Sequence, residues 1–186
     1  MTGWALVKRL VALGGAALIA AALARFALAR PAIEVRFPRS AAASAERRDL
    51  ANFREGPTVR VSSVLWASRH HPGYLVDGAG RPSQLEKWVS APGDAHPFVE
   101  VQLREPHALD ELSLELAGAH EEPARTEPSY LIECFAGERP VWRLPVAGNL
   151  APRPRHPLLC PASDRVRVTF APRDLARVYE LELWGR

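Results

Sequence analysis

The chain has one group of residues whose types and spacing resemble a metal site: the adjacent His70 and His71, with Asp77 nearby. Imidazole nitrogens and a carboxylate can together bind a transition metal. Pro72 and Gly73 follow the two histidines directly, however, and loop histidines in such a setting are ordinarily surface residues. We therefore interpret the pair as surface residues and predict no transition-metal site.

The chain contains no motif of a known catalytic centre. It lacks a nucleophile elbow, a zinc-binding HExxH pair, a phosphate-binding glycine loop and a CxxC pair. Aspartate and glutamate are plentiful, but nothing in their spacing pairs two of them as acid and base. We expect a protein without catalytic activity.

The two cysteines, Cys134 and Cys160, are too few and too far apart in sequence for a metal site. In an oxidising compartment they could form a disulfide that stabilises the fold by about 3.5 kcal/mol through chain entropy. Two buried free thiols are equally compatible with the sequence, because it does not give the distance between them.

Composition and charge exclude several classes of protein. With 186 residues, 47% apolar and 24% charged, the chain is not a disordered one. Seventeen prolines and 12 glycines favour a loop-rich or all-β body over a helical bundle. Residues 1–56 carry nine cations and four anions, whereas the remainder carries fifteen cations and seventeen anions. A slightly acidic body lacks the basic face that nucleic acid requires, so we expect no nucleic-acid partner.

An uncharged apolar run, residues 10–24, follows a cationic pair near the N-terminus. Counted with its flanks, the segment 4–29 could span a bilayer as one transmembrane helix, with Arg25 reaching to the interface. The stretch also has the features of a signal peptide cleaved after Ala29, which would make the protein secreted, and a buried Ala-rich helix is a third interpretation. We predict an uncleaved anchor over residues 1–29.

The side of the membrane that the body occupies depends on two conflicting signals. The positive-inside rule counts two cations before the apolar run and four soon after it, which favours a cytoplasmic body. A short cationic N-terminus followed by an apolar run usually acts as an export signal. We therefore expect an extracytoplasmic body, on the periplasmic or cell-surface side.

Beyond the anchor we expect a linker and one β-rich body. Residues 30–57 are predicted to form a juxtamembrane stalk, in which a short strand is possible over 33–37. From residue 58 onward the hydrophobic period is two, which is typical of half-buried strands. The expected strands are 59–65, 98–103, 109–116, 130–135, 141–144, 165–170 and 178–184, with the prolines between them. This pattern predicts an all-β fold, an antiparallel β-sandwich over residues 58–186.

Five short motifs follow one another along the body in a distinctive order. They are VLWAS (64–68), HPGYLVDG (71–78), WVS (88–90), PFVEVQL (97–103) and YELELWG (179–185). This order resembles the discoidin domain, also called the coagulation-factor type C domain, of the galactose-binding-like superfamily. The resemblance implies a jelly-roll β-sandwich without catalytic activity.

The resemblance also implies a ligand site in the loops at one end of the sandwich. Family members bind sugars there, and sometimes phospholipid headgroups or protein surfaces, by stacking a ring on the sugar face and binding hydroxyls with His, Arg or Asn. The implied ligand-binding residues are Arg69, His70, His71, Tyr74, Arg81 and Trp88. Trp88 and Trp184 match positions that usually pack in the core, and packing is the alternative role for Trp88.

Many family members hold a structural calcium ion, and Asp77 and Glu180 match two of its ligand positions. Calcium takes about six to eight oxygens, so two carboxylates are not enough. The loop between Asp77 and Trp88 departs from the family pattern, with Ser83 as the nearby oxygen-bearing candidate. A degenerate calcium site and a plain turn role for Asp77 both remain open.

Two functions are compatible with these features. The preferred one is a membrane-anchored, extracytoplasmic module that recognises a glycan or cell-surface polysaccharide. The alternative is an assembly subunit that docks on a membrane-protein complex and has no sugar site, which fits the departure in the calcium loop.

Overall fold

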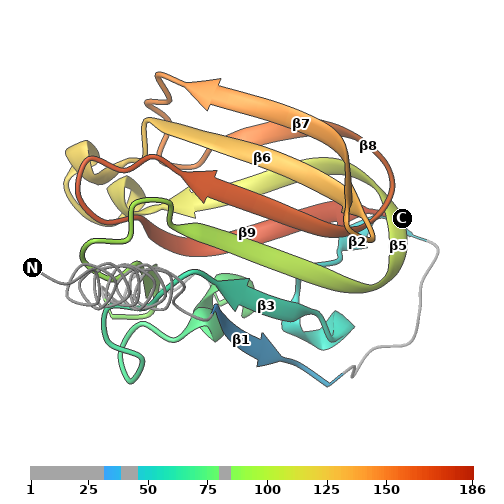
Figure 1. The fold of residues 1–186 in the computed structure, drawn as a ribbon, viewed down its shortest axis with the longest axis horizontal. Helices are drawn as coiled ribbons and strands as arrows, with labels where there is room; N and C mark the ends of the chain where they lie inside the picture. The colour runs from blue at the N-terminus through green and yellow to red at the C-terminus, as the bar shows by residue number, and fades with distance from the viewer. Residues whose placement is uncertain (1–31, 39–45, 80–84) are drawn as a thin grey trace, which may run out of the picture. The chain divides into compact units, whose positions relative to one another are not determined.

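The structure, a computed structural model, describes residues 32–38, 46–79 and 85–186. These residues form β-strands and short 3-10 helices, and none of them lies in an α-helix (Figure 1). The strands are β1 (Ile33–Arg36), β2 (Arg48–Asp49), β3 (Thr58–Val61), β4 (Trp88–Val89), β5 (Phe98–Leu116), β6 (Ser129–Ala136), β7 (Arg139–Ala147), β8 (Arg155–Phe170) and β9 (Arg177–Gly185). The 3-10 helices are η1 (Phe53–Glu55), η2 (Pro72–Val76), η3 (Ala117–Ala119) and η4 (Pro123–Arg125). The all-β prediction is confirmed.

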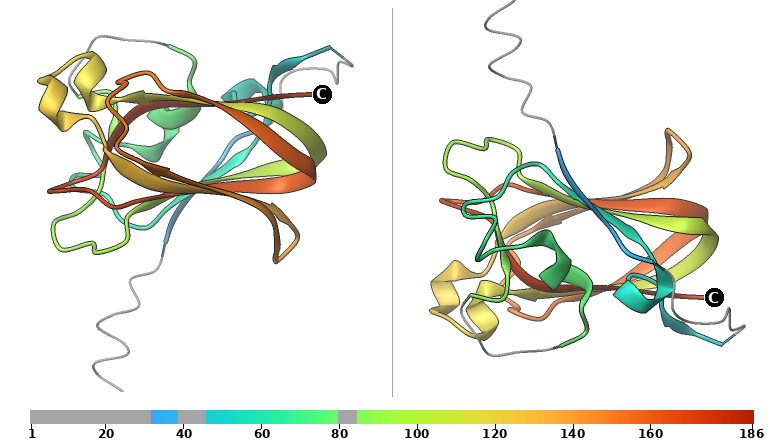
Figure 2. Two further views of the ribbon diagram at one scale, coloured as in Figure 1. Left: turned by 90° about the horizontal axis from the view of Figure 1, so that it is seen from above. Right: turned by 90° about the horizontal axis from the view of Figure 1, so that it is seen from below.

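The strands form two antiparallel layers that share β5 and β8 (Figure 2). One layer has the order β1-β3-β5-β8-β6-β7, and in the other β9 pairs with β5, β2 and β4. The pairing of β5 with β8 is irregular between Gln102 and Glu111. Such bulges bend a strand, and here they let both strands pass from one layer to the other. The predicted antiparallel sandwich is therefore confirmed.

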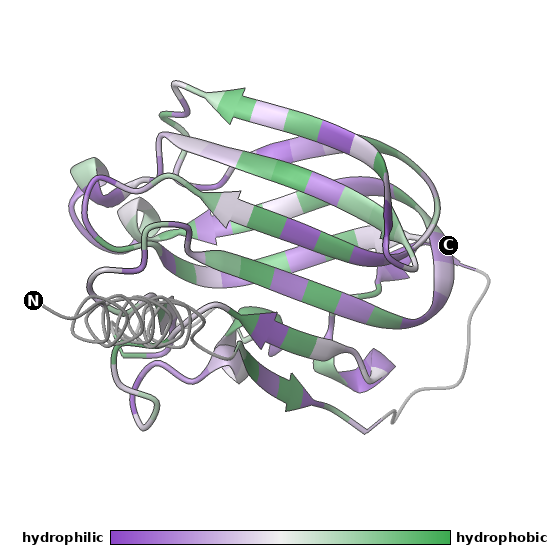
Figure 3. Cartoon of the chain, in the orientation of Figure 1, coloured by the Kyte–Doolittle hydropathy of each residue, from purple (hydrophilic) through white to green (hydrophobic). Residues whose placement is uncertain are grey.

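Alternate residues of each strand form the core between the layers (Figure 3). Val99 and Val101 of β5 have no exposed surface and lie inside. Trp88 is also fully buried, and its indole Nε1 donates a hydrogen bond to the carbonyl oxygen of Ser63 at 2.8 Å. Its ring centroid lies 6.2 Å from that of Phe170. Trp88 is thus a core residue.

The sandwich begins earlier in the chain than predicted. β1 pairs with β3, with Ile33 opposite Val61, and β2 pairs with β9. Leu50 and Ala51 are buried in the core, because the chain after β2 turns inward. The described part of the predicted stalk, residues 30–57, therefore belongs to the sandwich, and the boundary at residue 58 is wrong.

The segment predicted to anchor the chain lies outside the described residues. Within the part of the chain that the structure describes, no helix is long and apolar enough to cross a membrane.

Several prolines lie inside strands, which corrects the prediction that all of them fall between strands. Pro157 and Pro161 lie in the first half of β8, where its pairing with β5 is irregular. Pro140 and Pro145 lie in β7, the edge strand of its layer. At a bulge or an edge the missing N–H removes no ladder hydrogen bond that the sheet needs.

Cys134 of β6 and Cys160 of β8 form a disulfide, with their Cα atoms 6.1 Å apart. Both residues are buried in the core, with exposed fractions of 0% and 4%. Of the two states open from the sequence, the structure shows the bonded one.

Candidate functional site

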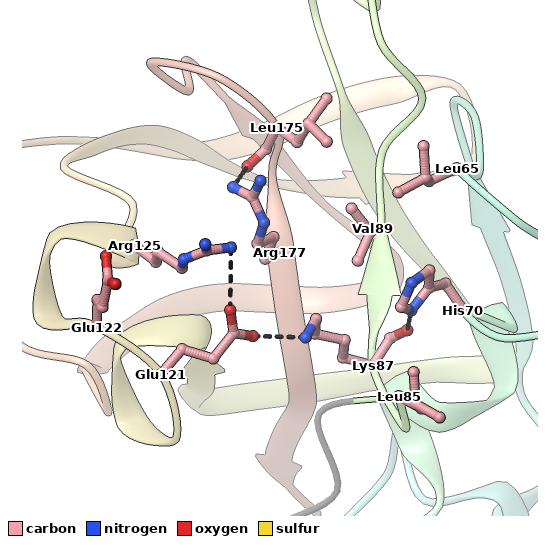
Figure 4. Close-up of a pocket in the computed structure, with 10 residues that line it drawn as sticks. All are labelled: Leu65, His70, Leu85, Lys87, Val89, Glu121, Glu122, Arg125, Leu175 and Arg177. Atoms are coloured by element: carbon pink, nitrogen blue, oxygen red, sulfur yellow. Dashed lines mark hydrogen bonds and ion pairs between the residues drawn. The ribbon is translucent and has the colours of Figure 1, made fainter.

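Loops at one end of the sandwich, on the left in Figure 1, surround a pocket of about 340 Å³. Its walls come from four separate segments: the loop after β3, β4 with the residues before it, the segment around η3 and η4, and the chain entering β9. Figure 4 shows the side chains that line it. Because each segment is tied to a different strand, the sandwich fixes their relative positions.

Trp66 projects from the loop after β3 with 56% of its surface exposed. The backbone N–H groups of Arg69 and His70 donate to its carbonyl oxygen at 2.9 and 2.8 Å, which closes a turn. Its ring stacks on the His70 ring, with the centroids 6.2 Å apart, and the Arg69 guanidinium carbon lies 5.8 Å from the ring centroid. An exposed aromatic ring held in this way offers a flat apolar face to a ligand.

His70 is buried and joins two of the loops that form the pocket. Its Nδ1 lies 3.2 Å from the carbonyl oxygen of Lys87, just before β4. Burial lowers the pKa of His70 against the opposing effect of this hydrogen bond, so the imidazole is neutral at neutral pH. His70 therefore positions the Trp66 ring.

A buried ion pair between Lys87 and Glu121 forms one wall of the pocket, with side chains only 7% and 8% exposed. The Tyr179 hydroxyl donates to the Glu121 carboxylate at 3.1 Å, and the Arg125 guanidinium lies 3.2 Å from it. Burial alone would raise the pKa of Glu121, but the hydrogen bonds from Lys87 and Tyr179 lower it. An ionised carboxylate with this many donors is suited to holding a fixed polar surface and poorly suited to accepting a proton.

Two guanidinium groups, those of Arg125 and Arg177, also line the pocket, and that of Arg125 is directed toward Glu121 (Figure 4). Arg177 donates to the carbonyl oxygen of Leu175 and to the carboxylate of Asp174, both at 2.8 Å. Arg125, Leu175 and Arg177 also line a second pocket of about 200 Å³. The two pockets therefore adjoin along this row of residues.

The structure brings two of the predicted ligand-binding residues, Arg69 and His70, together at Trp66. His71 instead caps η2, where its Nδ1 accepts a hydrogen bond from the backbone N–H of Gly73 at 3.0 Å. Its ring meets that of Tyr74 edge to face, with the centroids 6.3 Å apart. Neither His71 nor Tyr74 lines the pocket.

The remaining two predicted ligand-binding residues do not take part in the described site. Trp88 has no exposed surface, so it cannot stack on a sugar, and this assignment is wrong. The alternative role, packing in the core, is the one that the structure shows. Arg81 lies outside the described residues.

Asp77 and Glu180 meet at one turn, but each carboxylate binds backbone N–H groups there. Glu180 Oε1 accepts from Gly78 at 3.2 Å, and Asp77 Oδ1 accepts from Ala79 at 2.8 Å. Among the described residues, no three His, Cys, Asp or Glu side chains come together as metal ligands. Ser83, the other predicted oxygen ligand, lies outside the described residues, so the degenerate calcium site stays a prediction.

Glu180 makes the stability of the fold depend on pH. Burial, together with the nearby Asp77, Asp49 and Glu182, raises the pKa of Glu180 to about 9 against the hydrogen bond from Gly78. A carboxyl whose pKa is raised on folding stabilises the fold fully below its unfolded pKa, and this contribution is lost as the pH rises toward 9.

We therefore expect Glu180→Gln to raise the melting temperature by about 10 °C near pH 8 and to leave it unchanged near pH 4. At pH 8 the raised pKa costs the folded state about 5 kcal/mol at about 1.4 kcal/mol per pKa unit, and 1 kcal/mol shifts the melting temperature of a chain of this size by about 2–4 °C. Thermal unfolding with a chelator present measures this. Glu105→Gln, at a side chain 57% exposed, is the control and should change neither value. A Glu180→Gln variant less stable than the wild type at pH 8 would contradict the assignment.

No protein-family model matches the chain, and no curated protein matches it. Solved structures do match. The family 32 carbohydrate-binding module of Streptococcus pneumoniae EndoD is 18% identical with a TM-score of 0.60, over 75% of this chain and 100% of the module. A fucose-binding module from Streptococcus pneumoniae is 14% identical with a TM-score of 0.61, over 75% and 98%. A chitosan-binding module of a Paenibacillus sp. IK-5 chitosanase/glucanase is 19% identical with a TM-score of 0.58, over 74% and 99%.

The chain shares the fold of these three modules, and the match spans nearly the whole length of each. The shared fold is consistent with the β-sandwich that the order of the motifs predicts.

Sequence reasoning missed most of the residues that line the pocket. It also missed Trp66, which lies beside the pocket rather than in its lining: Trp66 stands within the first motif, and a tryptophan followed by the polar residues Ser68 and Arg69 could have indicated exposure. Lys87 and Glu121 carried no such signal, because their pairing depends on loops that are far apart in the sequence.

Proposed function

We propose that the protein is a non-catalytic glycan-binding module whose ligand binds at the loop end of the sandwich, on the face of Trp66 and in the adjoining pocket. The exposed Trp66 ring is the observation that carries the proposal. Trp66 lines a shallow hollow with Ala67, Ser68 and Arg69, and its ring is linked to the polar pocket through His70, which lines that pocket. Exposed large apolar side chains are characteristic of binding sites, and a sugar presents both an apolar C–H face and hydroxyls. The sugar-binding modules that share the fold support the same assignment.

Lys87 and Glu121 line the pocket and supply polar groups for such a ligand, and the buried Tyr179 holds both in place. Their bonds to one another fix the direction of each donor and acceptor before a ligand arrives. Pre-ordered groups of this kind bind hydroxyls at a low cost in conformational entropy.

We further propose that the N-terminal segment 1–29 holds the module at a membrane with the sandwich on the extracytoplasmic side. The Cys134–Cys160 disulfide supports this, because disulfides persist mainly in oxidising compartments. A reporter enzyme that is active only outside the cytoplasm, fused after Arg186, should be active and should sediment with membranes. Activity of a reporter that works only in the cytoplasm would overturn the proposed side.

Replacing Trp66 with alanine tests the glycan site. We expect the variant to lose at least about tenfold in affinity for any glycan that binds the wild type, since the stacked ring is a central contact. Its melting temperature should stay within about 1 °C of the wild type, because the side chain is largely exposed. Glycan-array screening followed by calorimetry measures the affinity.

His71→Ala is the matched control, because His71 is exposed on the same stretch of chain but caps η2 and packs on Tyr74 instead of joining the Trp66 and His70 rings. It should keep wild-type affinity. If no glycan binds the wild type, and a stoichiometric partner co-purifies with it in mild detergent, the assembly function replaces this one.

A further inference from the structure

The charges that face the pocket indicate which class of glycan it takes, an inference that rests on the proposed function. Three cations line the pocket: Lys87, Arg125 and Arg177. Glu121 faces them from the same wall as Lys87, and Figure 4 shows the Glu122 carboxylate turned away from this centre. The groups directed into the pocket therefore carry more positive than negative charge.

The Glu121 carboxylate does not use all the N–H donors of Arg125, because it also accepts hydrogen bonds from two other side chains. Lys87 and Tyr179 both bind it. Arg125 approaches it at 3.2 Å, and its side chain remains 44% exposed. A guanidinium has five N–H donors in a fixed fork, so Arg125 retains donors for a ligand.

Arg177 is held in place at the same side of the pocket by the carbonyl of Leu175 and by Asp174. Arg125 and Arg177 both belong to the ridge between the first pocket and the second, whose lining adds Arg173 together with the acidic residues Glu127 and Asp174. Asp174 already balances the charge of Arg177, and Glu121 lies beside Arg125. A negative group would therefore bind through the guanidinium N–H donors that these two contacts leave over.

We propose that the ligand is an acidic oligosaccharide. One sugar ring stacks on Trp66, and a carboxylate or sulfate of a neighbouring sugar binds Arg125 and Arg177. His70 links the two contacts, because its ring packs against Trp66 and also lines the pocket. Arginine is well suited to this role, since its planar fork matches a carboxylate or sulfate with two parallel hydrogen bonds.

Calorimetry with the full chain and three matched oligosaccharides tests the proposal. The probes are oligogalacturonate, its neutral methyl ester with the same backbone, and a sulfated galactan oligosaccharide. We expect at least one acidic probe to bind about 10–100-fold more tightly than the methyl ester, as a charge-assisted hydrogen bond predicts. The preference should weaken as the salt concentration rises. Whichever acidic probe binds more tightly identifies the group as a carboxylate or a sulfate.

Arg125→Gln should remove the preference and leave the affinity for the methyl ester unchanged. Arg143→Gln, on β7 with a side chain 61% exposed, is the control and should keep the preference. Equal affinity for the acidic and neutral probes, or a preference that survives Arg125→Gln, would overturn the acidic ligand. Binding of neutral probes that is lost in Trp66→Ala would leave the glycan function standing, whereas no binding of any glycan would overturn both.

Discussion

Replacing Glu100 with glutamine is expected to lower the free energy of unfolding by about 3–5 kcal/mol, although Glu100 lies on the outer face of its sheet. The carboxylate has no exposed surface. Arg60 binds it at 2.9 Å and Arg167 at 2.6 Å, and Arg165 lies 3.7 Å away. Loss of the single negative charge would leave these guanidinium groups crowded together without their partner.

Glu100 has this effect because it sits within a row of alternating charges that crosses all six strands of its layer. The row runs through Glu34, Arg60, Glu100, Arg167, Glu133 and Arg143, each directly opposite the next. Opposite charges at facing positions stabilise strand pairs, so the row also favours this strand order and register. Phe98 and Phe135 shield it, with the Arg167 guanidinium carbon 4.6 and 5.8 Å from their ring centroids.

Chemical denaturation of Glu100→Gln measures the loss. Glu138→Gln is the control, because Glu138 pairs with Arg165 but its side chain is 94% exposed. Exposed pairs contribute about 0–1 kcal/mol, so this variant should be close to the wild type. A Glu100→Gln variant as stable as Glu138→Gln would show that the row contributes little.

Trp88→Ala is the second substitution with a large expected effect. It should lower the free energy of unfolding by about 3–5 kcal/mol, because it leaves a cavity between the layers. The lost indole hydrogen bond to Ser63 adds to this cost. Chemical denaturation of the two variants distinguishes the roles of the two tryptophans. Trp66→Ala should keep wild-type stability, and Trp88→Ala should not. Wild-type stability together with lost glycan binding in Trp88→Ala would return Trp88 to the ligand site.

The alternation of apolar and polar residues predicted the sandwich well. Val99, Val101, Leu112 and Leu114 all have inward positions that follow from the period of two. The same pattern placed Glu100 on the outer face, but its complete burial depends on arginines from two other strands. No local pattern contains that information.

The site residues were hard to predict for the same reason: their exposure and pairing depend on contacts between distant parts of the chain. The motifs left both a ligand-binding role and a core role open for Trp88 and gave no exposure for Trp66, because the two tryptophans differ in tertiary surroundings and not in residue type. The start of the sandwich was missed for a related reason: β2 has only two residues, and Leu50 and Ala51 are too short a run to show a period. Pairing with β9 decides their place.

The central claim, that a glycan binds on Trp66 at the loop end, is tested most directly by the indole N–H signals of the five tryptophans in NMR spectra recorded during addition of a binding glycan. The account predicts that the Trp66 signal shifts on titration while the buried Trp88 signal stays in place. Shifts confined to Trp142 or Trp184, with the Trp66 signal unmoved, would contradict it.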